Sequence, residues 1–179
     1  MINRSDYDQY RAAGYNCIPM VRTVLADFET PLSAYVKLAQ GAYSYLLESV
    51  QGGEKWGRYS MIGLPCATVI KVDGDQVVIE EDGEVIHSQS TDDPLSAIQQ
   101  IQHQFRVPQI DGMPRFTGGL VGYFGYETIN YVETHLGETA KPDPVGAPDI
   151  LLMVSDEVVV FDNPSGRLHV IVHTDPEAA

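Results

Sequence analysis

The stretch PDILLMVSDEVVVFDNPSGRLHVIVHTD, from Pro148 to Asp175, decides the fold. Its first part, up to Asp162, is dominated by valine, leucine and other apolar residues, which is typical of a buried strand. The NPSG sequence that follows brings a proline and a glycine together, which is typical of a turn. We therefore predict one long strand that ends at Asp162 and turns back into a second strand, RLHVIVHTD.

The rest of the chain shows more predicted strands than helices. Thr30-Pro31 is typical of a helix cap followed by proline at the first helical position, and residues 91–105 predict a second helix with one apolar face. Asp-Gly pairs, typical of hairpin turns, separate several strands. Further strands are predicted over residues 18–25, 43–50, 58–64, 66–72, 76–80, 84–88 and 118–127.

The fold class that follows is α+β, mainly an antiparallel sheet with few helices. Two or three helices are too few to cover both faces of a sheet this large, so one face is left for a partner. We therefore expect the chain to be a fragment, or one half of a larger sandwich.

Composition narrows the functional classes. The chain has 179 residues, about the size of one domain, with 11 basic and 25 acidic residues and a formal net charge of −14. Such a charge disfavours binding to nucleic acid and to anionic membranes. Cys17 and Cys66 adjoin apolar residues and are predicted to be buried free thiols. No signal segment or membrane span is evident, so we expect a reducing cytoplasm.

No complete active site can be recognised from composition and spacing. His169 and His173 in HVIVH would lie on one face of a strand ~13 Å apart, too far to share one metal ion. The glycines of GGLVGYFGY match neither the dinucleotide fingerprint nor the phosphate loop. They instead indicate a strand with a bulge or a close backbone approach.

The stretch YLLESVQGGEKWGRYSMIG, from Tyr45 to Gly63, offers the best candidate chemistry. A predicted strand ends in Glu48 and Ser49, which could take a ligand ammonium group. Lys55 and Arg58 follow across a Gly-Gly loop and could take a ligand carboxylate. These residues could bind an amino acid. A surface salt bridge on a hairpin loop explains the same residues and remains open.

Four segments together resemble component I of anthranilate synthase, an enzyme family of tryptophan biosynthesis. They are LADFETPLSAYVKL, YLLESVQGGEKWGRYSMIG, FTGGLVGYFGYETINYVE and PDILLMVSDEVVVFDN, in family order over nearly the whole chain. The LLES tetrapeptide is similar to the family's feedback element, where L-tryptophan binds. The resemblance thus implies that Glu48 and Ser49 contact tryptophan. Arg58 falls near a basic position of the family, and Lys55 is a weaker match.

The resemblance also implies the activity of a longer subunit. That subunit is a lyase that converts chorismate and ammonia to anthranilate and pyruvate, and a glutaminase subunit, component II, supplies the ammonia. Its fold is an αββα-type sandwich with two facing sheets and helices outside. The family's C-terminal domain, absent here, binds chorismate and Mg²⁺. We therefore expect residues 1–179 to be one N-terminal regulatory domain, without catalytic residues or metal, inactive alone and in contact with its own C-terminal domain.

Two other functions remain open. The large subunit of aminodeoxychorismate synthase shares this N-terminal architecture, although LLES and the QGGEKWGRYS loop favour the anthranilate member. Outside the enzymes, the chain could be a stand-alone amino-acid sensor that needs no second domain.

Overall fold

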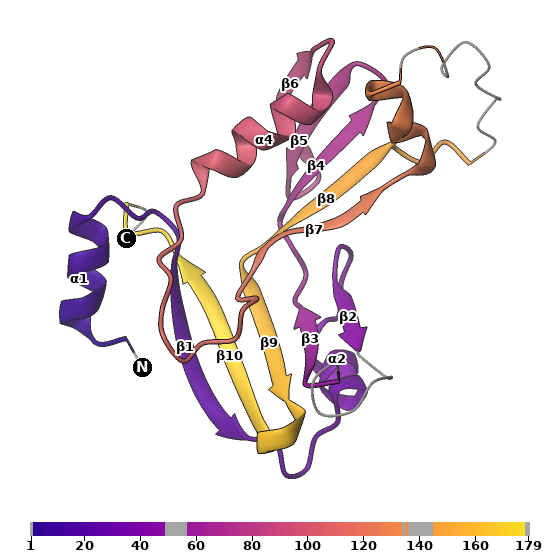
Figure 1. Ribbon diagram of the computed structural model, residues 1–179. Coiled ribbons are helices and arrows are strands. Elements are labelled where there is room, and N and C mark those ends of the chain that lie inside the picture. The colour runs from indigo at the N-terminus through magenta and orange to yellow at the C-terminus, as the bar shows by residue number, and fades with distance from the viewer. Residues whose placement is uncertain (1, 49–56, 134, 136–144, 178–179) are drawn as a thin grey trace. The chain divides into compact units, whose positions relative to one another are not determined.

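The computed structural model describes residues 2–48, 57–133, 135 and 145–177. The chain divides into two compact units, each built around its own five-stranded sheet (Figure 1). The first unit comprises Met1–Cys66, Phe105–Gly119 and Ser155–Ala179, and the second comprises Ala67–Gln104 and Leu120–Val154. The regulatory domain that we expected over residues 1–179 therefore contains two structural units, and its regulatory role stays a prediction.

The elements of the two units alternate along the chain. The first unit holds α1 (Arg4–Ala12), β1 (Ile18–Leu25), α2 (Pro31–Leu38), β2 (Tyr45–Glu48), β3 (Tyr59–Gly63), β9 (Glu157–Asp162), the 3-10 helix η3 (Asn163–Ser165) and β10 (Arg167–Thr174). The second holds β4 (Thr68–Asp73), β5 (Gln76–Glu81), β6 (Glu84–Ser90), α4 (Pro94–Gln104), β7 (Gly119–Phe124), the 3-10 helix η1 (Tyr126–Tyr131) and β8 (Ile150–Ser155). Gly119 at the start of β7 and Ser155 at the end of β8 are assigned to the first unit.

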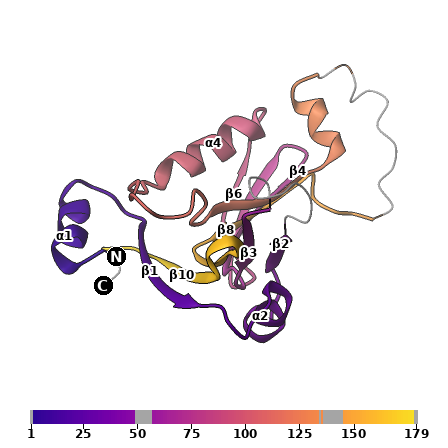
Figure 2. The same ribbon diagram turned by 60° about the horizontal axis from the view of Figure 1, so that its bottom comes forward.

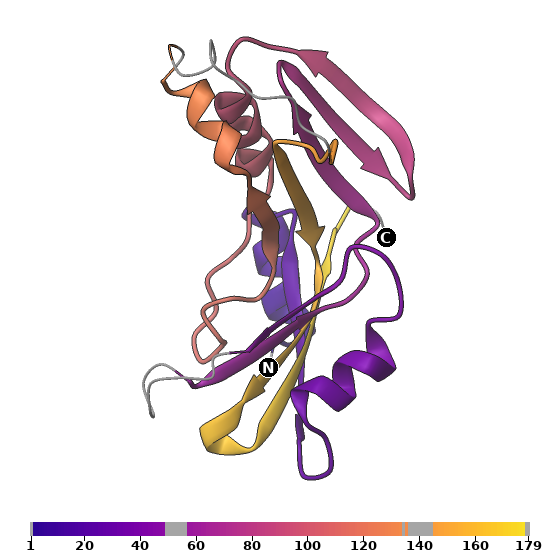
Figure 3. The same cartoon turned by 90° about the vertical axis from the view of Figure 1, so that its right-hand side faces the viewer.

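The sheet of the first unit has the order β1-β10-β9-β3-β2, and all its neighbouring strands are antiparallel. Alternate residues of these strands point to opposite faces and pack into two apolar clusters. On one face, Ile62, Val159 and Phe161 pack with Ala34 of α2, which lies beside the sheet in Figures 2 and 3. On the other face, Val158, Val160 and Ile171 pack with side chains that include Met113 and Phe116 of segment 105–119.

Local sequence explains the start of α2. Thr30 and Ser33 form a capping box, in which each side chain accepts a hydrogen bond from the other residue's backbone N–H. Pro31 occupies the first turn, where its missing N–H costs nothing. The predicted helix start is confirmed, as is the strand predicted over residues 18–25.

The sheet of the second unit has the order β6-β5-β4-β8-β7. Ala97 and Ile98 of α4 pack against the β4, β5 and β8 side chains, so this helix covers one face of that sheet (Figures 1 and 3). The Asp-Gly pairs form the turns around β5, where Gly74, Asp82 and Gly83 have positive φ angles. Gly122 of β7 lies so close to β8 that a Cβ atom would sit 1.9 Å from the Leu151 carbonyl oxygen, which confirms the predicted close backbone approach.

The single long strand predicted up to Asp162 is wrong, because the chain changes sheets within it. β8 pairs with β4 in the second unit, whereas β9 pairs with β10 and β3 in the first. At the break, the Asp156 carbonyl accepts a hydrogen bond from the His173 backbone N–H at 2.8 Å. Both flanking runs are apolar, and no proline or glycine lies between them to mark the break.

The α+β class with mainly antiparallel strands and few helices is confirmed. Helix α1 was not predicted, although its cap is visible in the sequence. Asn3 and Asp6 form a capping box at its start. Among the described residues, no helix combines the length and apolar character needed to cross a membrane.

Candidate functional site

Strands β2 and β3 pair as an antiparallel hairpin that carries the candidate site. The register places Glu48, the last residue of β2, opposite Ser60 of β3. Ser60 in turn opposes Phe161 of β9, so these three side chains share the face of the sheet that α2 packs on. Glu48 is exposed at the end of its strand. β2 therefore ends in the exposed carboxylate of Glu48, whereas the predicted hydroxyl of Ser49 lies outside the described residues.

Two of the four predicted site residues lie outside the described part of the chain. Ser49 and Lys55 both belong to residues 49–56, which separate β2 from Gly57 in the sequence. Their proposed contacts with a ligand stay predictions. Glu48 and Arg58, which are described, share no hydrogen bond or ion pair with each other.

Arg58 forms a two-pronged ion pair with Asp162 at the end of β9. Its Nε donates to Asp162 Oδ1 at 3.0 Å, and its Nη2 donates to Asp162 Oδ2 at 2.9 Å. The Asp162 side chain is only 8% exposed, whereas that of Arg58 is 52% exposed. The hydrogen bonds from Arg58 hold the pKa of Asp162 below its ordinary value, and the same bonds raise the pKa of Arg58. A salt bridge at the hairpin, the alternative left open by the sequence, is thus present at Arg58.

The guanidinium also lies over the ring of Tyr59, with 4.9 Å between the Arg58 Cζ atom and the ring centroid. Tyr59 packs in the apolar cluster of Val158 and Val160. That cluster lies on the face opposite the one that Glu48 shares with Ser60. The structure therefore directs the Glu48 and Arg58 side chains to different faces of the hairpin.

Asn163, which follows β9, holds the chain on both sides of Arg58. Its backbone N–H donates to the Arg58 carbonyl at 2.9 Å, and its side-chain Nδ2 donates to the Gly57 carbonyl at 3.1 Å. The same Nδ2 lies 3.4 Å from Ser60 Oγ. Sequence reasoning assigned no site role to Asp162 or Asn163, because the DNPSG sequence is read first as a turn. Only the register of β3 against β9 brings these two residues to the hairpin.

The described residues contain no group of three or more histidine, cysteine, aspartate or glutamate side chains placed to hold a metal ion. His169 Nδ1 lies 2.9 Å from Thr23 Oγ1, and His173 lies near Asp156 and Thr117. The two histidines thus have separate partners. Burial raises the pKa of both thiols, Cys17 and Cys66, to about 11, so they stay protonated at neutral pH.

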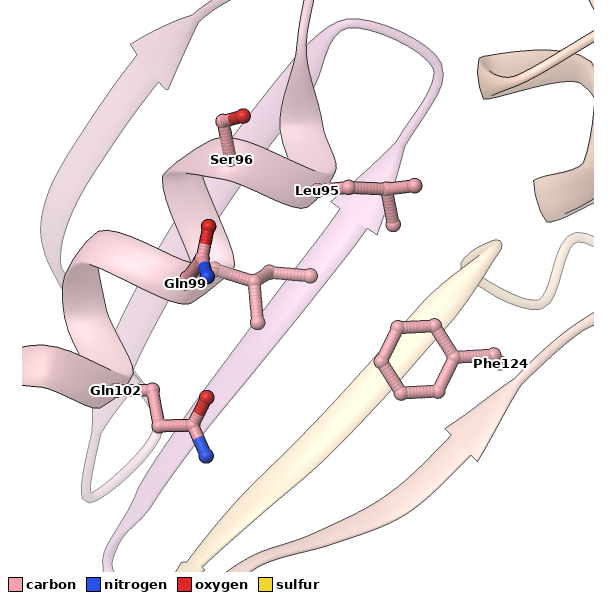
Figure 4. Close-up of a pocket in the computed structure, with 6 residues that line it drawn as sticks. Leu95, Ser96, Gln99, Gln102 and Phe124 are labelled. Atoms are coloured by element: carbon pink, nitrogen blue, oxygen red, sulfur yellow. The ribbon is translucent and has the colours of Figure 1, made fainter.

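Each unit also contains a small hollow. In the first, a cavity of about 160 Å³ is lined by Ile2, Val21, Thr23, Ile110, Asp111, Gly112, Met113, Pro114 and His169. In the second, a groove of about 330 Å³ lies between α4 and the end of β7 (Figure 4). Leu95, Ile98 and Phe124 form its apolar walls, and Ser96, Gln99 and Gln102 form its polar edge. This groove has no charged lining residue.

The fold and the hairpin together define a two-unit α+β protein with a polar strand end. Comparison with known proteins identifies relatives of this chain. Anthranilate synthase component 1 of Pseudomonas putida is 57% identical over 175 residues, which cover 98% of this chain and 36% of that protein. The protein of the same name from Neisseria meningitidis serogroup B (strain ATCC BAA-335 / MC58) is 51% identical over 179 residues. The match covers 98% of this chain and 36% of that protein. No protein-family model matches the chain.

These matches confirm the resemblance seen in the sequence: the chain is homologous to a segment of anthranilate synthase component 1. It spans about a third of the length of these curated relatives. Among solved structures, anthranilate synthase component I from Streptococcus pneumoniae TIGR4 matches 86% of this chain and 31% of its own chain, with 26% identity and a TM-score of 0.47.

Proposed function

We propose that this chain is part of an anthranilate synthase component I and carries its L-tryptophan-responsive element. The observation that carries this proposal is the 57% identity to anthranilate synthase component 1 over 98% of the chain. The relatives named above carry the anthranilate synthase name, which favours this function over aminodeoxychorismate synthase. The aminodeoxychorismate and stand-alone sensor functions become outcomes of the tests below.

The proposed reaction belongs to the longer subunit. It is the lyase reaction of chorismate with ammonia to give anthranilate and pyruvate, with ammonia from a glutaminase partner, component II. Mg²⁺, when bound, would neutralise the substrate carboxylate. The described residues of this chain contain no group of three or more histidine, cysteine, aspartate or glutamate side chains that fits Mg²⁺. From the family resemblance, we propose that the C-terminal domain of the longer subunit binds the metal and chorismate.

The proposed tryptophan site starts at the end of β2. Glu48 and Ser49 would accept hydrogen bonds from the ligand ammonium group, and a carboxylate is the stronger of the two acceptors for a cation. Support comes from the exposure of Glu48 at the end of β2, an edge strand that pairs with β3, which itself pairs with β9. Lys55 and Arg58 were expected to take the ligand carboxylate, and that role stays a prediction.

The proposed activity is tested with the full-length protein that contains this sequence. Chorismate, ammonium and Mg²⁺ should give the fluorescence of anthranilate, and L-tryptophan should reduce the rate. Formation of p-aminobenzoate instead would favour aminodeoxychorismate synthase.

A second arm uses the 179-residue chain alone, which should form no anthranilate above a heat-killed control. Tryptophan binding by this chain with an affinity equal to that of the full-length protein would favour the stand-alone sensor.

A further inference from the structure

The contacts of Arg58 differ from those expected of an arginine whose guanidinium is available to bind a ligand carboxylate. Its Nε and Nη2 already bind both oxygens of Asp162, and its planar group lies over the Tyr59 ring. Two parallel N–H···O bonds to one carboxylate fix the orientation of a guanidinium as well as its position. Arg58 is therefore held in the structure by Asp162, whose own side chain is buried.

The neighbouring residue of the turn holds the main chain at the same place. Asn163 binds the Arg58 carbonyl through its backbone N–H and the Gly57 carbonyl through its side chain. Gly57 directly follows residues 49–56 in the sequence, and Glu48 directly precedes them. Glu48 is thus held to the sheet by its pairing with Ser60, and Gly57 and Arg58 are held by Asp162 and Asn163.

We propose that Asp162 and Asn163 are positioning residues for the β2–β3 hairpin, which carries the proposed tryptophan site. Their contacts with Gly57 and Arg58 form a clamp, and Arg58 acts as part of this clamp rather than by binding the ligand. This inference rests on the proposed function. The Asn163 side chain also lies 3.4 Å from Ser60 Oγ, and Ser60 is paired with Glu48, so these contacts hold the strand position opposite the proposed ligand contact. A site that is held in place before binding loses less conformational entropy when the ligand binds, so the clamp raises ligand affinity. The Arg58 hydrogen bonds lower the pKa of Asp162, which keeps the clamp ionised at neutral pH.

Direct binding of the ligand carboxylate by Arg58 would predict the opposite result. If Arg58 bound the ligand carboxylate, Asp162 would compete with the ligand for the guanidinium. Removal of the Asp162 charge would then leave tryptophan inhibition unchanged or strengthen it. If Asp162 positions the hairpin, the same removal weakens inhibition.

The experiment measures tryptophan inhibition of the full-length protein and of its Asp162→Asn and Asn163→Ala variants. Both variants should need about 2- to 30-fold more tryptophan for half-inhibition, the range for residues that act through others. The kcat without tryptophan and the KM for chorismate should stay within about 2-fold of wild type. Asp162→Glu, which keeps the carboxylate, should restore part of the inhibition.

A matched control comes from Asp27→Asn, the same change at an exposed aspartate of the first unit. It should leave the inhibition curve at the wild-type position. Unchanged or stronger inhibition in both Asp162→Asn and Asn163→Ala would overturn the clamp. A wild-type protein that makes anthranilate without responding to tryptophan would overturn the proposed function and the clamp together.

Discussion

The ring of Tyr45 lies against Gly63, its direct partner across the β2–β3 pair. A Cβ atom added at Gly63 would lie 2.0 Å from the ring, far inside van der Waals contact. The Tyr45 hydroxyl forms a 2.8 Å hydrogen bond with the Ser155 hydroxyl. The hairpin that carries the candidate site is therefore held to its unit by a ring that needs a glycine beside it.

Substitution of Gly63 by alanine should destabilise the protein. The added methyl group forces the Tyr45 ring to move, and overpacking of this kind costs about 1–3 kcal/mol of unfolding free energy. Urea unfolding of the 179-residue chain, followed by circular dichroism, measures the change. The matched control is Gly63→Ala in a Tyr45→Ala background, where the ring is gone and the methyl group should cost much less. Equal costs in both backgrounds would show that the ring contact is not the cause.

Removal of the Tyr45 hydroxyl should also lower stability, by a smaller amount. Burial raises the pKa of Tyr45 to about 12, so the hydroxyl stays protonated at neutral pH and can take part in the bond to Ser155. Tyr45→Phe leaves the ring on Gly63 but removes one partner of this bond, at a cost of about 0.5–1.5 kcal/mol. A double-mutant cycle with Ser155→Ala measures the coupling, and strictly additive costs would contradict a direct bond.

His173 should make stability depend on pH. Burial lowers its pKa below the ordinary 6.5, although a hydrogen bond to the Asp156 carbonyl partly offsets the effect. Between the ordinary pKa and the lower pKa of the folded state, His173 is protonated in the unfolded chain but not in the folded chain. The His173 contribution is therefore present above pH 6.5 and is lost as pH falls from there through the folded pKa.

The check compares urea unfolding of wild type and His173→Gln at several pH values from about 7.5 to 5. The wild type should lose more unfolding free energy over this range than the variant does. Parallel curves for the two proteins would contradict the prediction.

The sequence predicted several elements from local signals, although it missed α1, whose Asn3–Asp6 cap is also a local signal. Thr30-Pro31 marked the start of α2 and the Asp-Gly pairs marked the turns around β5, because caps and turns depend on residues close in sequence. It failed at Asp156, where two apolar runs join and the chain passes from one sheet to the other. The position of this break depends on which strands pair with β8 and β9, and a partner such as β4 lies far away in the sequence.

The same distinction applies to the candidate site. Glu48 was predicted because it ends an apolar run, a local signal, and the structure places it at the end of β2. Asp162 was missed because its partner Arg58 is 104 positions away, and only the pairing of β3 with β9 brings them together. A charged residue on a predicted loop could be assigned to a ligand or to a salt bridge, and the sequence alone could not choose between them.

Ser49 gives the most direct test of the proposed tryptophan element. In the full-length protein, Ser49→Ala removes a hydroxyl from the proposed ligand contact, which costs about 0.5–1.5 kcal/mol. Half-inhibition should then need about 2- to 13-fold more tryptophan, because 1.4 kcal/mol corresponds to about tenfold in affinity. Ser49→Phe should weaken inhibition further, since its ring would overlap the ligand. The rate without tryptophan should change little in either variant, because the proposed catalytic residues lie outside this chain. Wild-type inhibition curves in both variants would show that the LLES sequence does not bind tryptophan here, whereas a rate lost in parallel with inhibition would point to a folding defect.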